Sequence, residues 1–208
     1  LGVQKTCPEC TIDVRFINTW HDPTIEQEGA KSLFDAGAQV VMTGADTPAP
    51  AIAAPEGKWG ITYDYVNNCT HDACLTSMYW NWGPLYAIEI KKSMEGTFAG
   101  EAIYFDGDSG GLGLFGFMEG EELMPGVVGL PEEDLQLIRT ELAKFLSGEM
   151  TRFDVFKGPI TDNQGNVVLA EGESLRQVDL DCFEGPGAPC EGGVGMYWWN
   201  QNVTAELP

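Results

Sequence analysis

The segment DPTIEQEGAKSLFDAGAQVV, residues 22–41, predicts a helix followed by an apolar strand. Asp22 is a good N-cap, and Pro23 suits the first helical position, where a missing backbone N–H costs nothing. The predicted inner face of this helix consists of Ile25, Gly29, Ala30, Leu33 and Phe34. We expect the helix to end at Gly37 and the strand to follow as AQVVMT.

The segments on either side repeat this alternation of strands and helices. A strand is predicted before it at IDVRFI, residues 12–17. After it come a brief helix beginning at Thr47-Pro48, strands at WGITYD (59–64) and LTSMY (75–79), and a helix at about residues 84–94. This order predicts an α/β fold with a mainly parallel sheet and helices on both faces.

The second half of the chain has a different pattern. Residues 106–130 are rich in glycine and predict a loop or an irregular strand, and their G-L-G run lacks the spacing and the lysine of a phosphate-binding loop. Pro131 predicts the start of an amphipathic helix ending at Gly148. The apolar face of that helix consists of Leu135, Ile138, Leu142 and Phe145. Residues 155–175 predict a β-hairpin that turns at 163–166.

The charge of the chain excludes some classes of partner. Thirty-two acidic and 11 basic residues give a formal net charge of −21. Nucleic acids and anionic membrane surfaces bind Lys and Arg, so we expect neither as a partner. The scattered acidic residues indicate a solubilising surface in a saline or extracellular setting. We expect no transmembrane helix and see no signal-peptide pattern at the first residues, so a signal for export would have been removed or would lie outside the chain.

The six cysteines fall into three close pairs. The simplest pairing joins Cys7 to Cys10, Cys69 to Cys74 and Cys182 to Cys190, although six cysteines allow many other connectivities. Local disulfides indicate an oxidising compartment. The alternative, in which CPEC is a redox or zinc motif, lacks a second ligand pair and a following helix. The N-x-T sequons at Asn68 and Asn202 are candidate glycosylation sites and are compatible with secretion.

Polar and aromatic side chains follow the predicted strands where these end. The carboxyl ends of parallel strands meet at one edge of a sheet, where loops and helix N-termini form binding sites. The residues that we expect to bind a ligand there are Trp20, Gly44, Asp46, Asp64, Trp80 and Asn81. A planar ligand could stack on Trp20 or Trp80, while Asp64 accepts its N–H groups. Asp46 has a second interpretation as the cap of the next short helix, and Trp82 is expected in the core or hinge.

The sequence lacks the residue sets that hydrolases and metal enzymes use. It has no nucleophile elbow, Ser-His-Asp set or zinc-binding helix, and two histidines leave little capacity for general-base catalysis. Asp106 and Asp108 match part of a calcium loop, but a turn explains them equally well. We therefore expect no enzyme activity, no cofactor and no metal site.

Five stretches in this order carry a family resemblance: DPTIEQEGAKSLFDAGAQVV, TGADTPAPA, GITYDY, LTSMYWNWGP and FKGPITDNQGNVVLAEGESL. Together they resemble the carboxyl-terminal part of the basic membrane protein family, the PnrA-like substrate-binding proteins of ABC transporters. The resemblance extends from about Ile12 to the end of the chain. It implies a type I periplasmic-binding fold and a secreted, periplasmic or cell-surface protein without catalytic activity. Such a protein closes two lobes on a purine nucleoside or a related small molecule and delivers it to an ABC permease.

The resemblance also implies roles for single residues. Trp20 matches the aromatic position before the family's D-P, which lines the cleft, and Gly44 matches a backbone segment that approaches the ligand. Asp64 matches the aspartate that binds the nucleoside. Trp80 lies where many members carry a lysine that reaches the ribose hydroxyls. Tryptophan offers one N–H and a stacking face instead, so a free purine base such as adenine becomes the expected ligand.

The family's amino-terminal half, which builds most of lobe one, has no counterpart here. The resemblance implies that residues 1–74 form lobe two and that 75–97 help to complete lobe one. Residues 98–208 would return to lobe two with the amphipathic helix, the hairpin and a hinge-crossing tail. The helix at 84–94 would then expose an apolar face, so we expect a second chain or a further region to supply the missing half. Self-association is left open, as is a second role as an extracellular structural or sensory module without transport.

Overall fold

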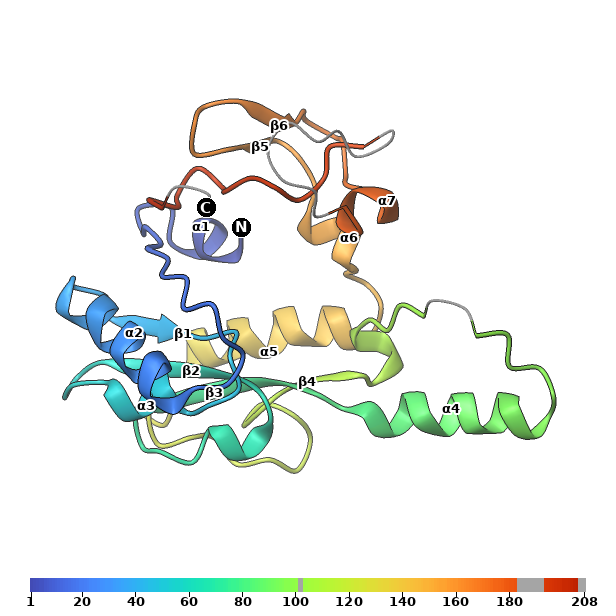
Figure 1. Cartoon of the computed structure of the whole chain (residues 1–208), viewed down its shortest axis with the longest axis horizontal. Helices are drawn as coiled ribbons and strands as arrows, with labels where there is room; N and C mark the ends of the chain where they lie inside the picture. Colours follow the sequence, from blue (N-terminus) through green and yellow to red (C-terminus); the bar gives the residue numbers. More distant parts are fainter. Residues whose placement is uncertain (101–102, 183–192, 206–208) are drawn as a thin grey trace. The chain divides into compact units, whose positions relative to one another are not determined.

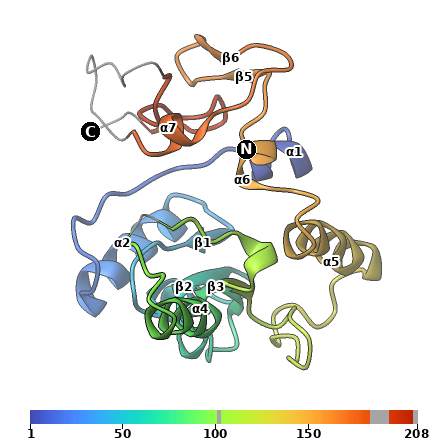
Figure 2. The ribbon, with the colours of Figure 1, turned by 90° about the vertical axis from the view of Figure 1, so that its right-hand side faces the viewer.

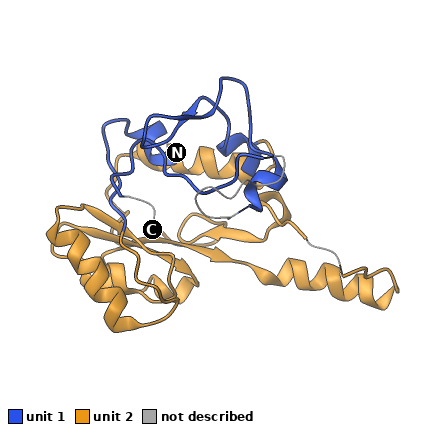
Figure 3. Ribbon diagram, turned by 45° about the horizontal axis from the view of Figure 1, so that its top comes forward, with its two compact units in different colours: residues 1–14, 150–208 blue, residues 15–149 orange. Residues whose placement is uncertain are grey.

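The computed structural model of the chain describes residues 1–100, 103–182 and 193–205. The chain forms two compact units, of which unit 2 holds residues 15–149 and unit 1 holds residues 1–14 and 150–208 (Figure 3). The division of the chain among two lobes stays a prediction.

Unit 2 is built on a four-stranded sheet in the order β1-β2-β3-β4 (Figure 1). The strands are β1 (Val40–Met42), β2 (Trp59–Asp64), β3 (Cys74–Trp80) and β4 (Leu112–Leu114). The first three run parallel to one another, and β4 pairs antiparallel with β3. The mainly parallel sheet is therefore confirmed.

Helices flank this sheet, and most begin where the sequence predicts. They are α2 (Pro23–Asp35), α3 (Ala49–Ala53), α4 (Trp82–Met94) and α5 (Glu132–Leu146), with short 3-10 helices η1 (Val66–Asn68) and η2 (Gly107–Ser109). The Asp22 carboxylate accepts hydrogen bonds from the backbone N–H groups of Thr24 and Ile25, which confirms it as the N-cap of α2.

Close packing holds α2 and α3 against the strands. Ala30 and Phe34 of α2 pack on Val41 of β1. A Cβ at Gly60 would lie 2.4 Å from the backbone nitrogen of Ala51, so only glycine allows α3 to approach β2 this closely.

The predicted inner face of α2 is wrong at one end. Ile25 is 41% exposed, whereas the neighbouring Glu26 is 3% exposed. The burial of Glu26 has a polar cause, because both of its carboxylate oxygens accept hydrogen bonds. A pattern of apolar residues alone does not reveal a buried carboxylate of this kind.

The strand predicted at residues 12–17 is wrong. Ile12 alone pairs, in an isolated parallel bridge with Val203, and the residues after it join no ladder. β1 is an edge strand of the sheet, and this segment does not pair with its free edge. Phe16 is 54% exposed, which shows that β-branched and aromatic residues make a strand only where a partner covers them.

The glycine-rich region contains β4, and one glycine is essential to its pairing. Gly113 lies opposite Tyr79 of β3, and a Cβ at residue 113 would lie 2.1 Å from the Tyr79 ring. The Tyr79 hydroxyl donates a hydrogen bond to Glu121 at 3.0 Å. Glu121 in turn accepts from the backbone N–H of Gly116 at 2.7 Å, which fixes the turn after β4.

Unit 1 is a small body that brings the beginning and the end of the chain together. Its elements are α1 (Gly2–Thr6), α6 (Arg152–Val155), β5 (Ile160–Thr161), β6 (Val167–Leu169) and α7 (Gln177–Leu180), which Figure 2 also labels. The antiparallel pairing of β5 with β6 confirms the predicted hairpin. Its core is formed by Ile160, Leu169 and Leu175.

The α4 helix stands apart from the packed elements of unit 2. It extends beyond the end of the sheet, and none of its residues is buried (Figure 1). Tyr86, Ile90 and Met94 are 58%, 61% and 83% exposed. The expectation that this helix exposes apolar side chains is confirmed. Among the described residues, no helix combines the length and the apolar character needed to cross a membrane.

Candidate functional site

The predicted ligand residues collect at one edge of the sheet in unit 2. Because β1, β2 and β3 are parallel, their carboxyl ends lie together, and we call this region the carboxyl edge. It consists of residues 43–47 after β1, 64–68 at the end of β2, and 80–81 at the end of β3. The backbone N–H of Asp46 donates to the carbonyl of Trp20 at 2.8 Å, which attaches the Trp20 loop to the same edge.

Asp64 has an unusual backbone conformation at this edge. It is the last residue of β2, and its φ of 74° lies in the left-handed region that residues other than glycine rarely occupy. Strained residues of this kind concentrate at functional sites. Within the part of the chain that the structure describes, its half-buried carboxylate accepts no hydrogen bond, so both oxygens are available to a ligand.

A buried disulfide and one amide hold the loop after β2. Cys69 and Cys74 are joined, and their side chains are 1% and 0% exposed. The Asn68 amide donates to the carbonyl of Asp46 at 3.2 Å and to that of Tyr63 at 3.1 Å. This amide therefore ties the loop after β1 to the loop after β2.

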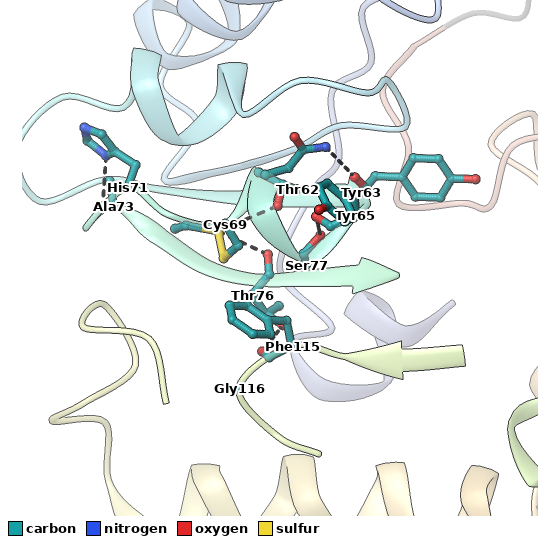
Figure 4. Close-up of a disulfide and its surroundings, with 12 residues drawn as sticks. Thr62, Tyr63, Tyr65, Cys69, His71, Ala73, Thr76, Ser77, Phe115 and Gly116 are labelled. Atoms are coloured by element: carbon teal, nitrogen blue, oxygen red, sulfur yellow. Dashed lines mark hydrogen bonds between the residues drawn. A yellow bond between two sulfur atoms is a disulfide. The ribbon is translucent and has the colours of Figure 1, made fainter. Parts of the chain in front are cut away.

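Figure 4 shows the strand partner of this loop. The Ser77 hydroxyl, on β3, donates to the carbonyl of Tyr65 at 3.3 Å. The Thr62 hydroxyl lies 3.8 Å from the sulfur of Cys74, and Thr76 donates to the carbonyl of Phe115 at 2.8 Å. These contacts tie β2 and the residue after Asp64 to β3, and tie β3 to the residue after β4.

Glu26 links α2 to the carboxyl edge. One oxygen of its buried carboxylate accepts the backbone N–H of Asp22 at 2.9 Å, and the other accepts the hydroxyl of Thr47 at 2.6 Å. Neither Glu26 nor Thr47 was expected at the site. An acidic residue four positions after a helix cap, one position later than in a capping box, is the signal that could have identified Glu26.

Aromatic side chains at the ends of β2 and β3 and in the first turns of α4 form a continuous row. The Trp80 indole N–H donates to the Tyr63 hydroxyl at 3.1 Å, and the two rings meet edge to face with centroids 6.2 Å apart. Trp82 follows at 5.9 Å from Trp80, and Tyr86 stacks on Trp82 at 6.1 Å. Trp82 is 50% exposed, so of its two predicted locations, the core or the hinge, the core is wrong.

The remaining predicted ligand residues have simple surroundings. Trp20 is 76% exposed, and Gly44 is exposed as well. The Asn81 amide donates to the carbonyl of Gly110 at 2.9 Å, which joins the start of α4 to the glycine-rich region. Ligand binding by these residues stays a prediction.

The disulfide prediction is confirmed for two pairs. Cys7 is bonded to Cys10, and Cys69 is bonded to Cys74. Cys182 is also disulfide-bonded, while its predicted partner Cys190 lies outside the described residues.

Both sequon asparagines use their amides inside the protein. Asn68 donates two hydrogen bonds to backbone carbonyls, as described above. Asn202 is 9% exposed, and its amide donates to the carbonyl of Cys10 at 3.5 Å. A glycan is attached through the same amide nitrogen, so a glycan on either residue would alter these contacts. Glycosylation at Asn68 and Asn202 stays a prediction.

Unit 1 contains a hollow that is lined by a charged pair. This hollow of about 410 Å³ is lined by Arg176 and Asp179, but Asp179 is 2% exposed and accepts from Arg176 and from the Val194 backbone. The hydrogen bond from Arg176 holds the pKa of the Asp179 carboxyl below its usual value, and the pair is a structural contact. Among the described residues, no three His, Cys, Asp or Glu side chains gather in a way that would hold a metal ion.

Comparisons with known proteins identify relatives of this chain. A family model described as ABC transporter substrate-binding protein PnrA-like matches residues 1–128. A purine-binding protein of Brucella abortus (strain 2308) is 29% identical over 211 residues, covering 100% of this chain and 53% of the relative. A putative ABC transporter glucose-binding protein of Haloferax volcanii is 31% identical over 106 residues, covering 50% of this chain and 27% of that protein.

A solved structure agrees with these matches at the level of the fold. It is an ABC transporter solute-binding protein from Conexibacter woesei DSM 14684, with a TM-score of 0.50 and 19% identity. The similarity covers 72% of this chain and 48% of the other, and it supports the α/β periplasmic-binding fold. The chain thus spans about half the length, or less, of the curated relatives that it matches. Since the family model covers more than half of its residues, the chain belongs to the PnrA-like family of ABC transporter substrate-binding proteins.

Proposed function

We propose that this chain is the ligand-binding part of a solute-binding protein that captures a purine base or a related flat heterocycle for ABC-type uptake. The observation that carries the proposal is the pairing of two groups at the carboxyl edge. Asp64 offers a carboxylate without a hydrogen-bond partner among the described residues, and Trp80 ends the neighbouring strand with an aromatic face. A purine base presents the matching chemistry, with N–H donors at its edge and a flat ring to stack.

The choice of base over nucleoside depends on Trp80. A tryptophan has one N–H donor and no charge, so it is a poor partner for the paired hydroxyls of a ribose. The relative from Brucella abortus, which is named purine-binding, supports this ligand class. The relative from Haloferax volcanii is named glucose-binding, and a sugar ring can also lie on an aromatic face, so glucose is the competing ligand.

Location and partners follow from the family. Proteins of this family serve ABC transporters and are not enzymes, and the confirmed disulfides favour an oxidising compartment. We therefore place the protein outside the cytoplasmic membrane, where it delivers its ligand to an ABC permease.

The exposed α4 helix supports a further part of the proposal. Its apolar side chains, including Ile90 and Met94, lie in water in this chain alone. Exposed apolar surface of this kind marks an interface. The curated relatives are about twice as long or longer. We propose that residues outside this chain, in the same or a second polypeptide, cover α4 and complete the first lobe, with a second copy of the chain as the competing occupant.

Calorimetric titration of the natively purified protein, together with any accompanying chain, tests the ligand. We expect adenine to bind the wild type and to lose affinity by about tenfold or more in Asp64→Asn, since a hydrogen bond to a charged group contributes about 1.5–3 kcal/mol. Glu28→Gln, an exposed acidic residue on α2, is the control and should bind normally.

Three outcomes would contradict the proposal in different ways. If Asp64→Asn bound adenine as tightly as the wild type, Asp64 would not be part of the binding site. Binding of glucose in place of adenine would change the ligand class. Native mass spectrometry that finds no bound small molecule, but a large ordered assembly, would favour an extracellular structural module without transport.

A further inference from the structure

The indole of Trp80 has a single polar atom, and a protein partner already uses it. The Trp80 N–H donates to the Tyr63 hydroxyl at 3.1 Å, an ordinary length for an N–H···O hydrogen bond. An indole nitrogen carries one proton and accepts no hydrogen bond. In this conformation Trp80 therefore has no polar group left to offer a ligand.

The packing of the rings holds Trp80 in this orientation. Tyr63 lies opposite Met78 in the register of β2 and β3. Trp80 comes two residues after Met78, and alternate residues of a strand point to the same face, so Tyr63 and Trp80 project from one face of the sheet. The Tyr63 and Trp80 rings are 86° apart, which is the favourable edge-to-face arrangement. Trp82 lies against Trp80 with its centroid 5.9 Å away and its plane tilted by 32°.

We infer that Tyr63 is a positioning residue, which holds the indole of Trp80 so that Trp80 contacts the ligand only by ring stacking. The inference rests on the proposed function, because it assigns Trp80 a part in binding the ligand. At Trp80 the ligand is recognised by the face of its ring, and its hydrogen bonds are made elsewhere, with Asp64 at the end of β2 as the proposed acceptor. This favours planar unsaturated rings with N–H donors over ligands that need a donor from Trp80.

A matched pair of tyrosine variants tests the positioning role. Tyr63→Phe removes only the hydroxyl that accepts from Trp80. Tyr65→Phe is the control, because the Tyr65 hydroxyl also accepts a hydrogen bond, from the Asn67 amide at 2.6 Å, and lies two residues away. The first measurement is the indole N–H resonance of Trp80 in a nitrogen-15 NMR spectrum, assigned as the peak that Trp80→Phe removes.

We expect Tyr63→Phe to shift this resonance upfield and Tyr65→Phe to leave it in place. Adenine affinity should fall in Tyr63→Phe by about two- to tenfold, the range of one neutral hydrogen bond, and stay unchanged in the binding control Glu28→Gln. An unmoved Trp80 resonance in Tyr63→Phe would overturn the inference. So would a moved resonance with unchanged adenine affinity.

Substitution of Trp80 itself tests whether stacking is its whole contribution. Trp80→Phe keeps an aromatic face but loses the same hydrogen bond as Tyr63→Phe, so adenine affinity should fall by the same roughly two- to tenfold. Trp80→Ala removes the face and should cost about tenfold or more, as the loss of a base-stacking side chain does. Equal losses in the two variants would overturn the inference.

The same data separate this inference from the proposed function. If the wild type binds no adenine, the purine proposal fails, whatever the NMR spectrum shows. If the wild type binds adenine and the Trp80 resonance does not depend on Tyr63, the purine proposal stands and the positioning role fails.

Discussion

The carboxylate of Glu26 accepts a 2.6 Å hydrogen bond from the hydroxyl of Thr47, 21 residues later in the chain. Both side chains are buried, at 3% and 4% exposure. The second oxygen of Glu26 accepts the backbone N–H of Asp22. One side chain of α2 thus joins the loop that carries Trp20 to the loop that carries Asp46, before any ligand is bound.

Removal of this carboxylate should destabilise the protein. Glu26→Ala removes the acceptor of the buried Thr47 hydroxyl and of the part-buried Asp22 N–H, and each unpaired donor costs about 1–3 kcal/mol. We expect a loss of about 2 kcal/mol or more in the free energy of unfolding, measured by urea denaturation. The control Glu28→Ala changes an exposed carboxylate on the same helix and should cost less than about 0.5 kcal/mol. Equal effects of the two variants would show that Glu26 does not connect the loops.

Two substitutions at Asp64 can separate the effect of its left-handed backbone conformation from the effect of its charge. Asparagine tolerates this conformation, whereas alanine pays about 1 kcal/mol for it. Asp64→Asn should therefore remove the charge without changing stability, and Asp64→Ala should be less stable by about 1 kcal/mol. The matching pair Asp46→Asn and Asp46→Ala, at a residue without positive φ, should show no such difference. Equal stability of both Asp64 variants in urea denaturation would contradict the strain.

Tyr79 should make the stability of the folded protein depend on pH in the alkaline range. Burial, and then the hydrogen bond to Glu121, raise the pKa of Tyr79 from 10.0 to about 12. Since the pKa is higher in the folded state, the contribution of this hydroxyl to stability is complete below pH 10 and is lost as the pH rises to about 12. The difference between wild type and Tyr79→Phe in phenolate absorbance should reveal the titration.

Glu121→Gln provides the control for this titration. It removes the charge of the acceptor but not the burial of Tyr79, so the pKa should fall only part of the way to 10.0. A wild-type Tyr79 that titrates near 10 would show that its hydroxyl is free in water.

The buried disulfide should stabilise the carboxyl edge. Replacing Cys69 and Cys74 by alanine removes a short covalent loop, and the loop-closure entropy predicts a loss of about 2 kcal/mol. Hydrogen exchange should become faster at the amides of Asn68 and Cys69, which donate to Tyr65 and Val66. Replacing Cys7 and Cys10, in unit 1, should leave these amides unchanged. Unchanged exchange in the Cys69 and Cys74 variant would show that the loop holds without the disulfide.

Local patterns predict most of the elements of unit 2. The cap at Asp22 and the proline after it define the start of α2, and WGITYD is β2 from its first residue to its last. These signals depend on neighbours in the chain. The segment at 12–17 has the composition of a strand, but composition does not decide whether a segment pairs with a strand, and here Ile12 alone pairs. For the region that contains β4, the sequence predicts either a loop or an irregular strand. The pairing of β4 depends on Gly113 lying opposite Tyr79, which local sequence does not show.

The candidate site was predictable only in part, for a similar reason. Strand ends can be read from the sequence, so Asp64 and Trp80 were expected at the same edge. The residues that hold them cannot be read in this way, because Tyr63 and Asn68 act through partners that follow from the register and the loop conformation. A buried polar contact has no periodic signature.

The two hydrogen bonds of the Asn68 amide have a consequence for how the protein should be produced. Asn68 is in an N-x-T sequon, and a glycosylating expression host acts on such sequons while the chain is still emerging and unfolded. A sugar attached then would occupy the nitrogen that later ties Asp46 to Tyr63. Material from a bacterial host, or from a Thr70→Ala variant in a eukaryotic one, would preserve the native loop connection.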